Sequence, residues 1–401
     1  MEATIRIAHF LWGRCNPDSP NGVDKSVYYL ARTQAEFDND VAIFSISDKP
    51  PIPVPGCEVR SYPPGRLALR FKNDRLRDLI LRSPLNLPPA LIPDLMAWQP
   101  SVVHFHFVHL PQAIRIARRL RARGVPYCVS PHGGLAVEAQ MRRGLLKKLF
   151  GLLFERSYLN NAAFLHALSG ADIEGVTKYG SRNRFVVAPN CIDPSLMPRD
   201  ADRQLITRRL PVLKGRRLLV YMGRLDPEQK GLDMLLRAFA AARAAEKVAL
   251  VLVGPDWRHG RPRLQSLARQ LAVEESALFL DAVFGKEKWD VLASADVFVH
   301  PSRWEGFPFV VLEAMLAGRP LLLTEPADPG GIVRQEEAGI VVPVDEDELA
   351  KAIMRVAEAQ TDDLEALGTA ARALVDREFR WERTTQTLLE AYRGVAASSI
   401  L

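Results

Sequence analysis

The segment from His300 to Pro320, HPSRWEGFPFVVLEAMLAGRP, constrains the fold of this 401-residue chain more than any other. The largely apolar run 295–300 predicts a strand, and Phe309–Leu316 predicts a helix, with a Gly-Phe-Pro turn between them. A strand, a turn and a helix in this order are typical of a parallel α/β sheet. The backbone amides at the start of such a helix favour an anion such as a phosphate.

Two glutamates of this segment, Glu305 and Glu313, stand eight residues apart. Glu305 therefore precedes the expected helix, and Glu313 projects from its second turn. A carboxylate at the second position can accept hydrogen bonds from a pair of hydroxyls. A ligand that carries a phosphate, a ribose diol and a second polyol is a nucleotide-sugar. We therefore expect this segment to bind a nucleotide-sugar.

A second motif follows the apolar run 218–222, which predicts a buried strand. It reads Gly223-Arg224-Leu225-Asp226-Pro227-Glu228-Gln229-Lys230-Gly231 and leads into an expected helix. Arg224 and Lys230 thus lie on a loop at the carboxyl end of a strand, where open α/β sheets bind ligands. Arginine can hold a phosphate through two nitrogens, and lysine acts as a point charge. The alternative is that both residues are ordinary surface charges on a loop.

The motifs GRLDPEQKGLDMLLRAF and PSRWEGFPFVVLEAMLAG resemble those of retaining, family 4-type (group 1) nucleotide-sugar glycosyltransferases of the GT-B fold. Four further segments fit this family in the same order, at 130–134, 189–193, 252–256 and 379–383. The resemblance covers nearly the whole chain. It implies an α/β fold of two Rossmann-like, doubly wound domains that face each other across a cleft, with a C-terminal helix that crosses back to the first domain.

The resemblance also implies roles for individual residues. Arg224 and Lys230 would neutralise the donor diphosphate, Glu305 would reach the donor sugar, and Glu313 the ribose. The implied catalytic residues are Arg224, Lys230, Glu305 and His132, and the implied donor-binding residues are Gly22, Gly223, Gly306, Phe307, Pro308, Phe309, Val310 and Glu313.

Two of these residues lie in the first half of the chain. His132 follows an expected strand, which favours a ligand-facing position over that of a turn histidine that caps nearby backbone. Gly22 would let the backbone approach a ligand closely. The family usually has two glycines there, and the first position is Asn21 in this chain. Asparagine tolerates the left-handed backbone region better than most residues, so we expect the loop to survive.

The alternation of expected strands and helices predicts two domains. We expect an acceptor-binding domain over 1–195 together with the helix 381–401, a linker over 196–216, and a nucleotide-sugar-binding domain over 217–380. The expected strands are 4–11, 40–46, 101–106, 125–130, 163–167 and 184–188 in the first half, and 217–222, 247–253, 277–280, 295–299, 320–323 and 339–342 in the second. Residues 48–100, rich in proline, predict short helices in a variable lobe.

The charge of +6 is unevenly distributed. Residues 101–200 carry 14 Lys and Arg against 6 Asp and Glu. No nucleic-acid module accompanies this basic excess, so we expect a phosphorylated substrate or an anionic membrane surface rather than nucleic acid. The basic, apolar stretch 141–159 is by default a core helix with one wet face, and an interfacial membrane helix is the alternative.

The expected cellular location rests on sequence signals that the chain lacks. The chain shows no signal peptide and no apolar run of membrane-spanning length, and its four cysteines are scattered. We expect a cytoplasmic protein, with a peripheral position at the inner face of the membrane as the alternative.

Several patterns mimic metal sites. His104, His106 and His109 are close in sequence, but they belong to an expected core strand. Asp345-x-Asp347 and Asp38-x-Asp40 mimic a metal-binding DxD motif, but they flank expected helix ends. We therefore predict no essential metal and no cofactor, since the nucleotide-sugar is a substrate.

The sequence predicts transfer of a hexosyl group from a UDP- or GDP-sugar to a hydroxyl of a glycan or lipid-linked acceptor, with retained anomeric configuration, in polysaccharide or lipopolysaccharide synthesis at the cell surface. Two alternatives stay open. One is another enzyme on the same fold, such as a hydrolysing nucleotide-sugar epimerase or a phosphorylase. The other is a non-catalytic subunit that binds a nucleotide-sugar.

Overall fold

The computed structural model describes residues 4–19, 21–65, 83, 86–137, 140 and 151–398. The chain forms two compact units, one of residues 1–190 with 381–401 and one of residues 191–380. The predicted linker, 196–216, lies inside the second unit and contains the short helices α9 (Leu205–Arg209) and η5 (Pro211–Leu213). The roles expected for the two domains remain predictions.

The first unit is built on a seven-stranded sheet in the order β3-β2-β1-β4-β5-β6-β7. All its neighbouring strands are parallel. The strands are β1 (Arg6–Trp12), β2 (Asp40–Ile46), β3 (Cys57–Tyr62), β4 (Val102–Phe105), β5 (Tyr127–Val129), β6 (Phe164–Ala167) and β7 (Phe185–Val187).

The strand β3 was not expected within the proline-rich stretch 48–100. It lies at the edge of the sheet, where only β2 pairs with it. Most of its residues are partly exposed, and Glu58 and Arg60 pair with each other on its surface. An edge strand needs less apolar surface than a central one, so its hydrophobic pattern is weak.

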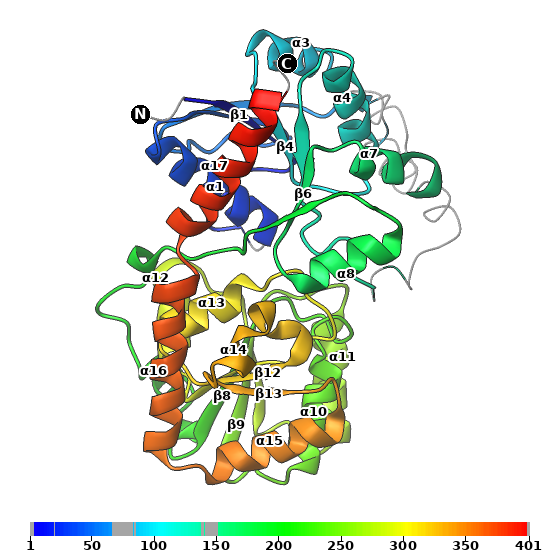
Figure 1. The fold of residues 1–401 in the computed structure, drawn as a ribbon. Helices are drawn as coiled ribbons and strands as arrows, with labels where there is room; N and C mark the ends of the chain where they lie inside the picture. The colour runs from blue at the N-terminus through cyan, green and yellow to red at the C-terminus, as the bar shows by residue number, and fades with distance from the viewer. Residues whose placement is uncertain are drawn as a thin grey trace. The chain divides into compact units, whose positions relative to one another are not determined.

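The helices of the first unit cover both faces of this sheet. They are α1 (Gly22–Glu36), α3 (Leu91–Ala97), α4 (Pro111–Arg121), the π-helix η3 (Gly151–Glu155), α7 (Arg156–Asn160), α8 (Gly170–Tyr179) and α17 (Trp381–Ser398). Although α17 is last in the chain, it lies beside α1 (Figure 1). Its Thr384 hydroxyl donates to the Pro189 carbonyl, which ties the end of the chain to the first unit as expected.

The second unit holds a six-stranded parallel sheet in the order β10-β9-β8-β11-β12-β13. Its strands are β8 (Arg217–Met222), β9 (Val248–Val253), β10 (Ala277–Leu280), β11 (Val297–His300), β12 (Leu321–Thr324) and β13 (Ile340–Val342). All six coincide closely with the expected strands, because each is a largely apolar run, mostly buried in the central strands and partly buried in the edge strands β10 and β13.

The second unit's main helices alternate with its strands. They are α10 (Leu232–Ala241), α11 (Gly260–Gln270), α12 (Gly285–Ser294), α13 (Phe309–Leu316), α14 (Ile332–Gln335), α15 (Glu346–Glu358) and α16 (Thr361–Glu378), with 3₁₀ turns η4 (Pro194–Leu196), η6 (Glu325–Ala327) and η7 (Pro329–Gly331). Leu232, Leu235 and Phe239 of α10 are fully buried. Their spacing puts them on one face of the helix, against the sheet.

Each sheet has one point at which the strand order reverses. It lies between β1 and β4 in the first unit and between β8 and β11 in the second. Loops at the carboxyl ends of such strand pairs diverge and leave room for a ligand. No described helix is long and apolar enough to span a membrane.

Candidate active site

The two loops that carry the sequence motifs flank the reversal point of the second unit's sheet. Residues 223–231 follow β8, and residues 301–308 follow β11. These two strands are neighbours in the sheet. The geometry therefore brings Arg224, Lys230 and Glu305 to the edge at which open α/β sheets bind ligands.

Glu305 is the centre of a buried hydrogen-bond cluster. Its Oε1 atom forms an ion pair with the Lys230 ammonium. The same oxygen accepts hydrogen bonds from His300 Nε2 at 2.9 Å and from Ser302 Oγ at 2.6 Å. The side chains of Lys230 and Glu305 are 11% and 8% exposed, so both charges are held largely out of water. Sequence reasoning did not find His300 and Ser302 as members of this cluster.

The ionisation of Glu305 follows from this cluster. Burial alone would raise the pKa of the carboxyl, but the Lys230 ammonium and the hydrogen bond from His300 outweigh burial and hold the pKa far below 4.5. Burial lowers the pKa of His300, whose ring stacks on Tyr221 at 5.4 Å between centroids. The site therefore contains an ionised carboxylate beside a neutral imidazole.

The two loops are fixed to each other by Gly231 and Arg303. Gly231 has φ +63°, and a Cβ atom there would collide with the carbonyl oxygen of Pro301. Only glycine permits both this backbone conformation and this close approach. The Arg303 guanidinium donates to Asp233 at 2.7 and 3.1 Å and to the Glu228 carbonyl at 2.8 Å. These contacts hold Lys230 at Glu305.

Arg224 is positioned by an aromatic ring from a third loop. Its guanidinium carbon lies 4.5 Å from the centre of the Trp257 ring. The Tyr221 hydroxyl donates to the Arg224 carbonyl at 2.9 Å, and the Leu225 amide donates to the Pro255 carbonyl at 3.0 Å. Trp257 follows β9, the strand next to β8, so the loops after these two strands meet at this cation.

The helix α13 begins beside these loops, with Pro308 as its N-cap. The side chains of Phe307 and Phe309 are buried, and Phe307 packs on Phe379 at 5.9 Å between ring centroids. Gly306 has no side chain, so in this turn the backbone is the part that can meet a phosphate. Glu313 is buried in the second turn of α13 and accepts a hydrogen bond from Lys288 at 3.0 Å.

The other two implied site residues, Gly22 and His132, belong to the first unit. Gly22 is the first residue of α1. Asn21 does not adopt the left-handed conformation that we considered: its backbone is extended, at φ −88°, and its side chain accepts from the Val23 amide at 3.2 Å. The loop therefore ends in an ordinary N-cap. His132, at φ +50°, lies in the turn after β5 and hydrogen-bonds to His106.

Asp24 is a candidate that sequence reasoning missed. It lies in the first turn of α1, beside the loop after β1, and accepts from Ser19 Oγ at 2.9 Å. Burial raises its pKa to about 6, only partly offset by the Ser19 hydrogen bond. An acidic residue at a helix start is common, so the sequence carried no signal that this one is buried.

The structure does not group His104 and His106 with His109. His109 hydrogen-bonds to the buried Glu155, whereas His9 of β1 joins His104 and His106. Both ring nitrogens of each member of this triad already have a hydrogen-bond partner. A metal ion would therefore have to displace these bonds.

The two acidic motifs lie at the ends of helices and strands. Asp345 is the N-cap of α15 and accepts from the Glu348 amide at 3.0 Å. Asp38 follows α1 at φ +57°, and Asp40 begins β2, where it pairs with Arg6 at 3.7 Å. Helix capping and a surface ion pair account for their positions.

The basic stretch 141–159 is described only from residue 151 onward, and residues 141–150 lie outside the described residues. Gly151–Glu155 forms the π-helix η3. Leu153 and Phe154 are 55% and 40% exposed, and Arg118 lies over the Phe154 ring at 5.8 Å. The membrane interface proposed for this stretch stays a prediction.

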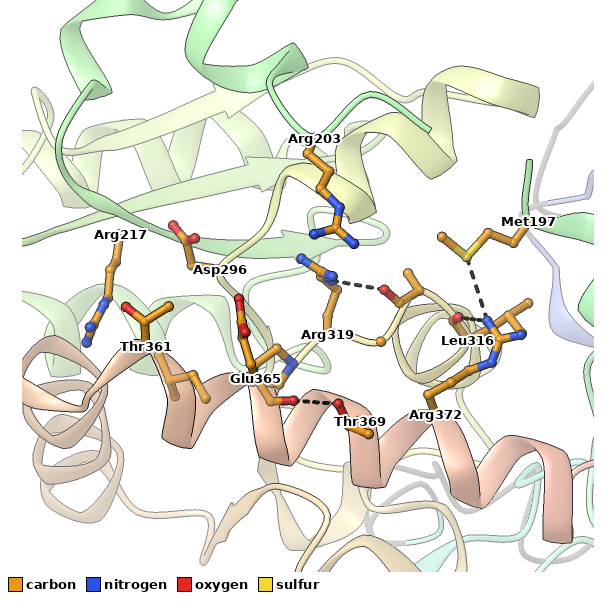
Figure 2. Close-up of a pocket in the computed structure, with 14 residues that line it drawn as sticks. Met197, Arg203, Arg217, Asp296, Leu316, Arg319, Thr361, Glu365, Thr369 and Arg372 are labelled. Carbon is orange, nitrogen blue, oxygen red and sulfur yellow. Dashed lines mark hydrogen bonds between the residues drawn. The ribbon is translucent and has the colours of Figure 1, made fainter. Parts of the chain in front are cut away.

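A cavity of about 500 Å³ lies at the opposite, amino edge of the second sheet. Figure 2 shows its arginines, of which Arg203 and Arg319 are directed toward each other. Arg319 donates to the carbonyls of Ala293, Ala295 and Ala317, at the ends of α12 and α13. Two further arginines in the lining act in the same way: Arg217 donates to Val356 and Ala359 at the end of α15, and Arg372 donates to Leu316 of α13. These cations stabilise helix ends.

Two family models match the chain, one to each half. Residues 21–191 match the "Glycosyl transferase 4-like domain" and residues 216–359 match "Glycosyl transferases group 1". The two matches together cover most of the chain, and both are to domains of glycosyltransferases. A D-inositol 3-phosphate glycosyltransferase of Saccharomonospora viridis is 34% identical over 190 residues, which is 45% of this chain and 43% of that relative.

Solved structures agree on the fold. Sucrose-phosphate synthase from Thermosynechococcus elongatus superposes with a TM-score of 0.79 at 22% identity, over 98% of this chain and all of that chain. HepE of Anabaena, solved in complex with UDP-glucose, gives a TM-score of 0.71 at 18% identity, over 97% of this chain and all of that chain. At these identities the likeness shows the fold, which is that of GT-B proteins.

Proposed function

We propose that this protein is a retaining glycosyltransferase that moves a hexosyl group from a UDP- or GDP-sugar to a hydroxyl of a glycan or lipid-linked acceptor. The observation that carries the proposal is the Lys230–Glu305 ion pair beside Arg224, at the reversal point of the second sheet. The matches to glycosyltransferase domains and the UDP-glucose complex of HepE support it.

The geometry suggests how the donor would be held. The diphosphate would lie against the α13 backbone amides, with Arg224 and Lys230 as counter-charges. The Glu313 carboxylate, already buried beside Lys288, would accept hydrogen bonds from the ribose hydroxyls. Because these two cations can balance the diphosphate, the proposal does not require a metal ion.

In the proposed reaction, the bond between the anomeric carbon and the diphosphate oxygen breaks, and a bond from that carbon to the acceptor oxygen forms. The acceptor proton passes to the departing phosphate, so a nucleoside diphosphate is released. Lys230 and Arg224 would stabilise the growing negative charge, which is often the largest catalytic contribution. Glu305 would remain ionised and orient Lys230 and the sugar.

The physiological setting is part of the proposal. We place the reaction in cell-surface polysaccharide synthesis, on the cytoplasmic side of the membrane. The four cysteines are free, which fits a reducing compartment.

The test is release of UDP or GDP from a panel of donor sugars in the presence of EDTA, with and without glycan, lipid-linked and inositol phosphate acceptors. The proposal predicts release that depends on one donor and one acceptor, and a product whose anomeric configuration by NMR matches the donor. Equal release without an acceptor would indicate a hydrolysing enzyme. Donor binding without turnover, under any acceptor, would indicate a non-catalytic subunit.

A further inference from the structure

A run of hydrogen bonds links His132 to the interior of the first unit. His132 Nε2 lies 3.1 Å from His106 Nδ1, and His106 Nε2 lies 2.8 Å from His9 Nδ1. His9 Nε2 then lies 2.7 Å from Oε1 of Gln34, on α1. We call these four residues the histidine chain. Its interior members, His9, His106 and Gln34, are fully buried.

A second run of the same kind lies beside it and serves as an internal reference. It leads from the Tyr392 hydroxyl to His104 at 2.6 Å, to Ser130 Oγ at 2.6 Å, to His166 Nδ1 at 2.6 Å and to the Ala188 carbonyl at 2.7 Å. We call it the tyrosine chain. A carbonyl can only accept, so each proton in this chain must be directed toward Ala188, and Tyr392 must donate to His104.

Gln34 sets the direction of the histidine chain at its interior end. Among the described residues, its buried Nε2 atom has no hydrogen-bond partner, and its Oε1 atom lies 2.7 Å from His9 Nε2. An amide oxygen can only accept, so His9 donates from Nε2. Each neutral imidazole has one donor and one acceptor nitrogen. The direction of the bond between His9 and Gln34 therefore fixes which nitrogen donates in every other histidine of the histidine chain.

Followed outward, the histidine chain determines the tautomer of His132. His9 donates from Nε2 and accepts at Nδ1, and His106 does the same. His132 must then donate from Nε2, which leaves its Nδ1 as a lone-pair acceptor. Among the residues that the structure describes, Nδ1 of His132 has no hydrogen-bond partner, and the His132 side chain is partly exposed.

We propose that Gln34, His9 and His106 are positioning residues that hold His132 as the Nε2–H tautomer, so that its Nδ1 accepts a hydrogen bond from a substrate hydroxyl. This inference rests on the proposed function, because the hydroxyl belongs to the glycosyl donor or to the acceptor. The chain ends on an amide, which takes up no proton at neutral pH. It therefore fixes proton positions and does not conduct protons.

Burial supports the neutral state that this arrangement needs. Burial lowers the pKa of His9 to about 4 and that of His132 to about 3, and neighbouring histidines add to the effect. The pKa of His106 is also well below its usual value, for the same reasons.

The first test measures the tautomer of His132 directly and does not depend on enzymatic activity. The whole protein is labelled with ¹⁵N-histidine, which gives eight ring systems, and long-range ¹H–¹⁵N correlation at pH 7 identifies the protonated nitrogen of each. The His132→Gln variant assigns the His132 signals by their loss. We expect His132 to be neutral with its proton on Nε2. A proton on Nδ1, or a cation, would overturn the proposal.

The second test uses a matched pair of variants. Gln34→Leu removes the acceptor at the interior end of the histidine chain, and Tyr392→Phe removes the donor at the start of the tyrosine chain. Each leaves one buried histidine nitrogen without its partner. We expect Gln34→Leu to produce a mixture of His132 tautomers and to lower kcat/KM at least about fivefold, the scale of one neutral hydrogen bond. Tyr392→Phe should leave the His132 tautomer unchanged.

Equal effects of the two variants on the His132 signals would contradict the proposal, since they would reflect a general loss of packing. A rise in KM for the donor alone, or for the acceptor alone, in Gln34→Leu identifies which substrate supplies the hydroxyl. If the wild-type protein transfers no sugar, the proposed function fails, and the tautomer of His132 still decides the inference. If Gln34→Leu does not fold, the wild-type spectrum decides it.

Discussion

The carboxyl and amino edges of the second unit's sheet both hold cations, but the two edges supply different kinds of partner for them. At the carboxyl edge, side chains supply the partners: Lys230 meets the Glu305 carboxylate, and Arg224 lies over Trp257. At the amino edge, the backbone supplies them, because Arg217 and Arg319 donate to carbonyls at helix ends.

The difference separates stability from function. The carbonyls at a helix end are fixed by the helix, and Arg217 and Arg319 donate to two and three of them, so a competing anion would have to replace several bonds at once. A side-chain partner can turn away when a competing anion arrives. Lys230 and Arg224 are therefore available to a phosphate in a way that Arg217 and Arg319 are not, and their edge is the one at which ligands bind in such sheets.

The largest expected effect is on catalysis at the carboxyl edge. Lys230→Ala and Glu305→Ala should each lower turnover at least about a hundredfold, the scale of losing one preorganised electrostatic contact. Steady-state transfer rates, with melting curves to confirm folding, provide the check. Near-normal turnover in either variant would end the assignment of this edge as the active site.

The amino edge should show the opposite behaviour. Arg319→Met removes the donors to three carbonyls and should lower the free energy of unfolding by about 1–3 kcal/mol. The transfer rate at a temperature where the variant is folded should stay within about twofold of wild type. Urea midpoints and initial rates measure the two quantities. A large loss of turnover without loss of stability would mean that this cavity has a role in the reaction.

Acid should reduce the contribution of the Lys230–Glu305 ion pair to the free energy of unfolding. The pKa of its carboxyl in the folded protein lies below the ordinary 4.5 because of Lys230 and His300, despite burial. The unfolded chain therefore binds more protons in this range, and the stability supplied by the ion pair is present above about pH 4.5 and lost as pH falls toward the folded value. The difference in urea midpoint between wild type and Glu305→Gln should be full at pH 7 and shrink below pH 4.5. A difference that does not change with pH would contradict the ion pair.

The smallest effect is expected at Trp257. Trp257→Leu removes the ring beneath Arg224 and keeps an apolar side chain, so the KM for the donor should rise a few-fold, consistent with about 0.5–1 kcal/mol for a partly exposed cation–π contact. The turnover number should change less than KM. Donor titrations of the initial rate distinguish the two, and an unchanged KM would show that the ring does not position Arg224 for the donor.

Much of the fold could be predicted from the sequence, because the central strands are continuous apolar runs and the helices have one apolar face. Phe309–Leu316 is α13 as expected, and the loops around Lys230 and Glu305 occupy the expected strand ends. The edge strand β3 was missed, since most of its side chains are only partly buried and carry little hydrophobic pattern.

The site was less predictable where partners come from distant parts of the chain. His9 and His104 are opposite each other in the register of β1 and β4, and Gln34 and Tyr392 approach them from two helices. Nothing in the local spacing of these residues indicates that they meet. The same holds for the histidines that are close in sequence: His109 contacts Glu155, and His9, distant in sequence, lies with His104 and His106, because partners are set by tertiary packing.

The most direct test of the account is the thermal shift given by UDP, GDP, ADP and their common sugars in EDTA, compared among wild type, Lys230→Ala and Arg319→Met. A ligand at a hundred times its dissociation constant should stabilise the folded state by about 2.7 kcal/mol. The account predicts that one nucleotide raises the melting temperature of wild type and of Arg319→Met by similar amounts, and that Lys230→Ala loses most of the shift. A shift that survives in Lys230→Ala and disappears in Arg319→Met would contradict it.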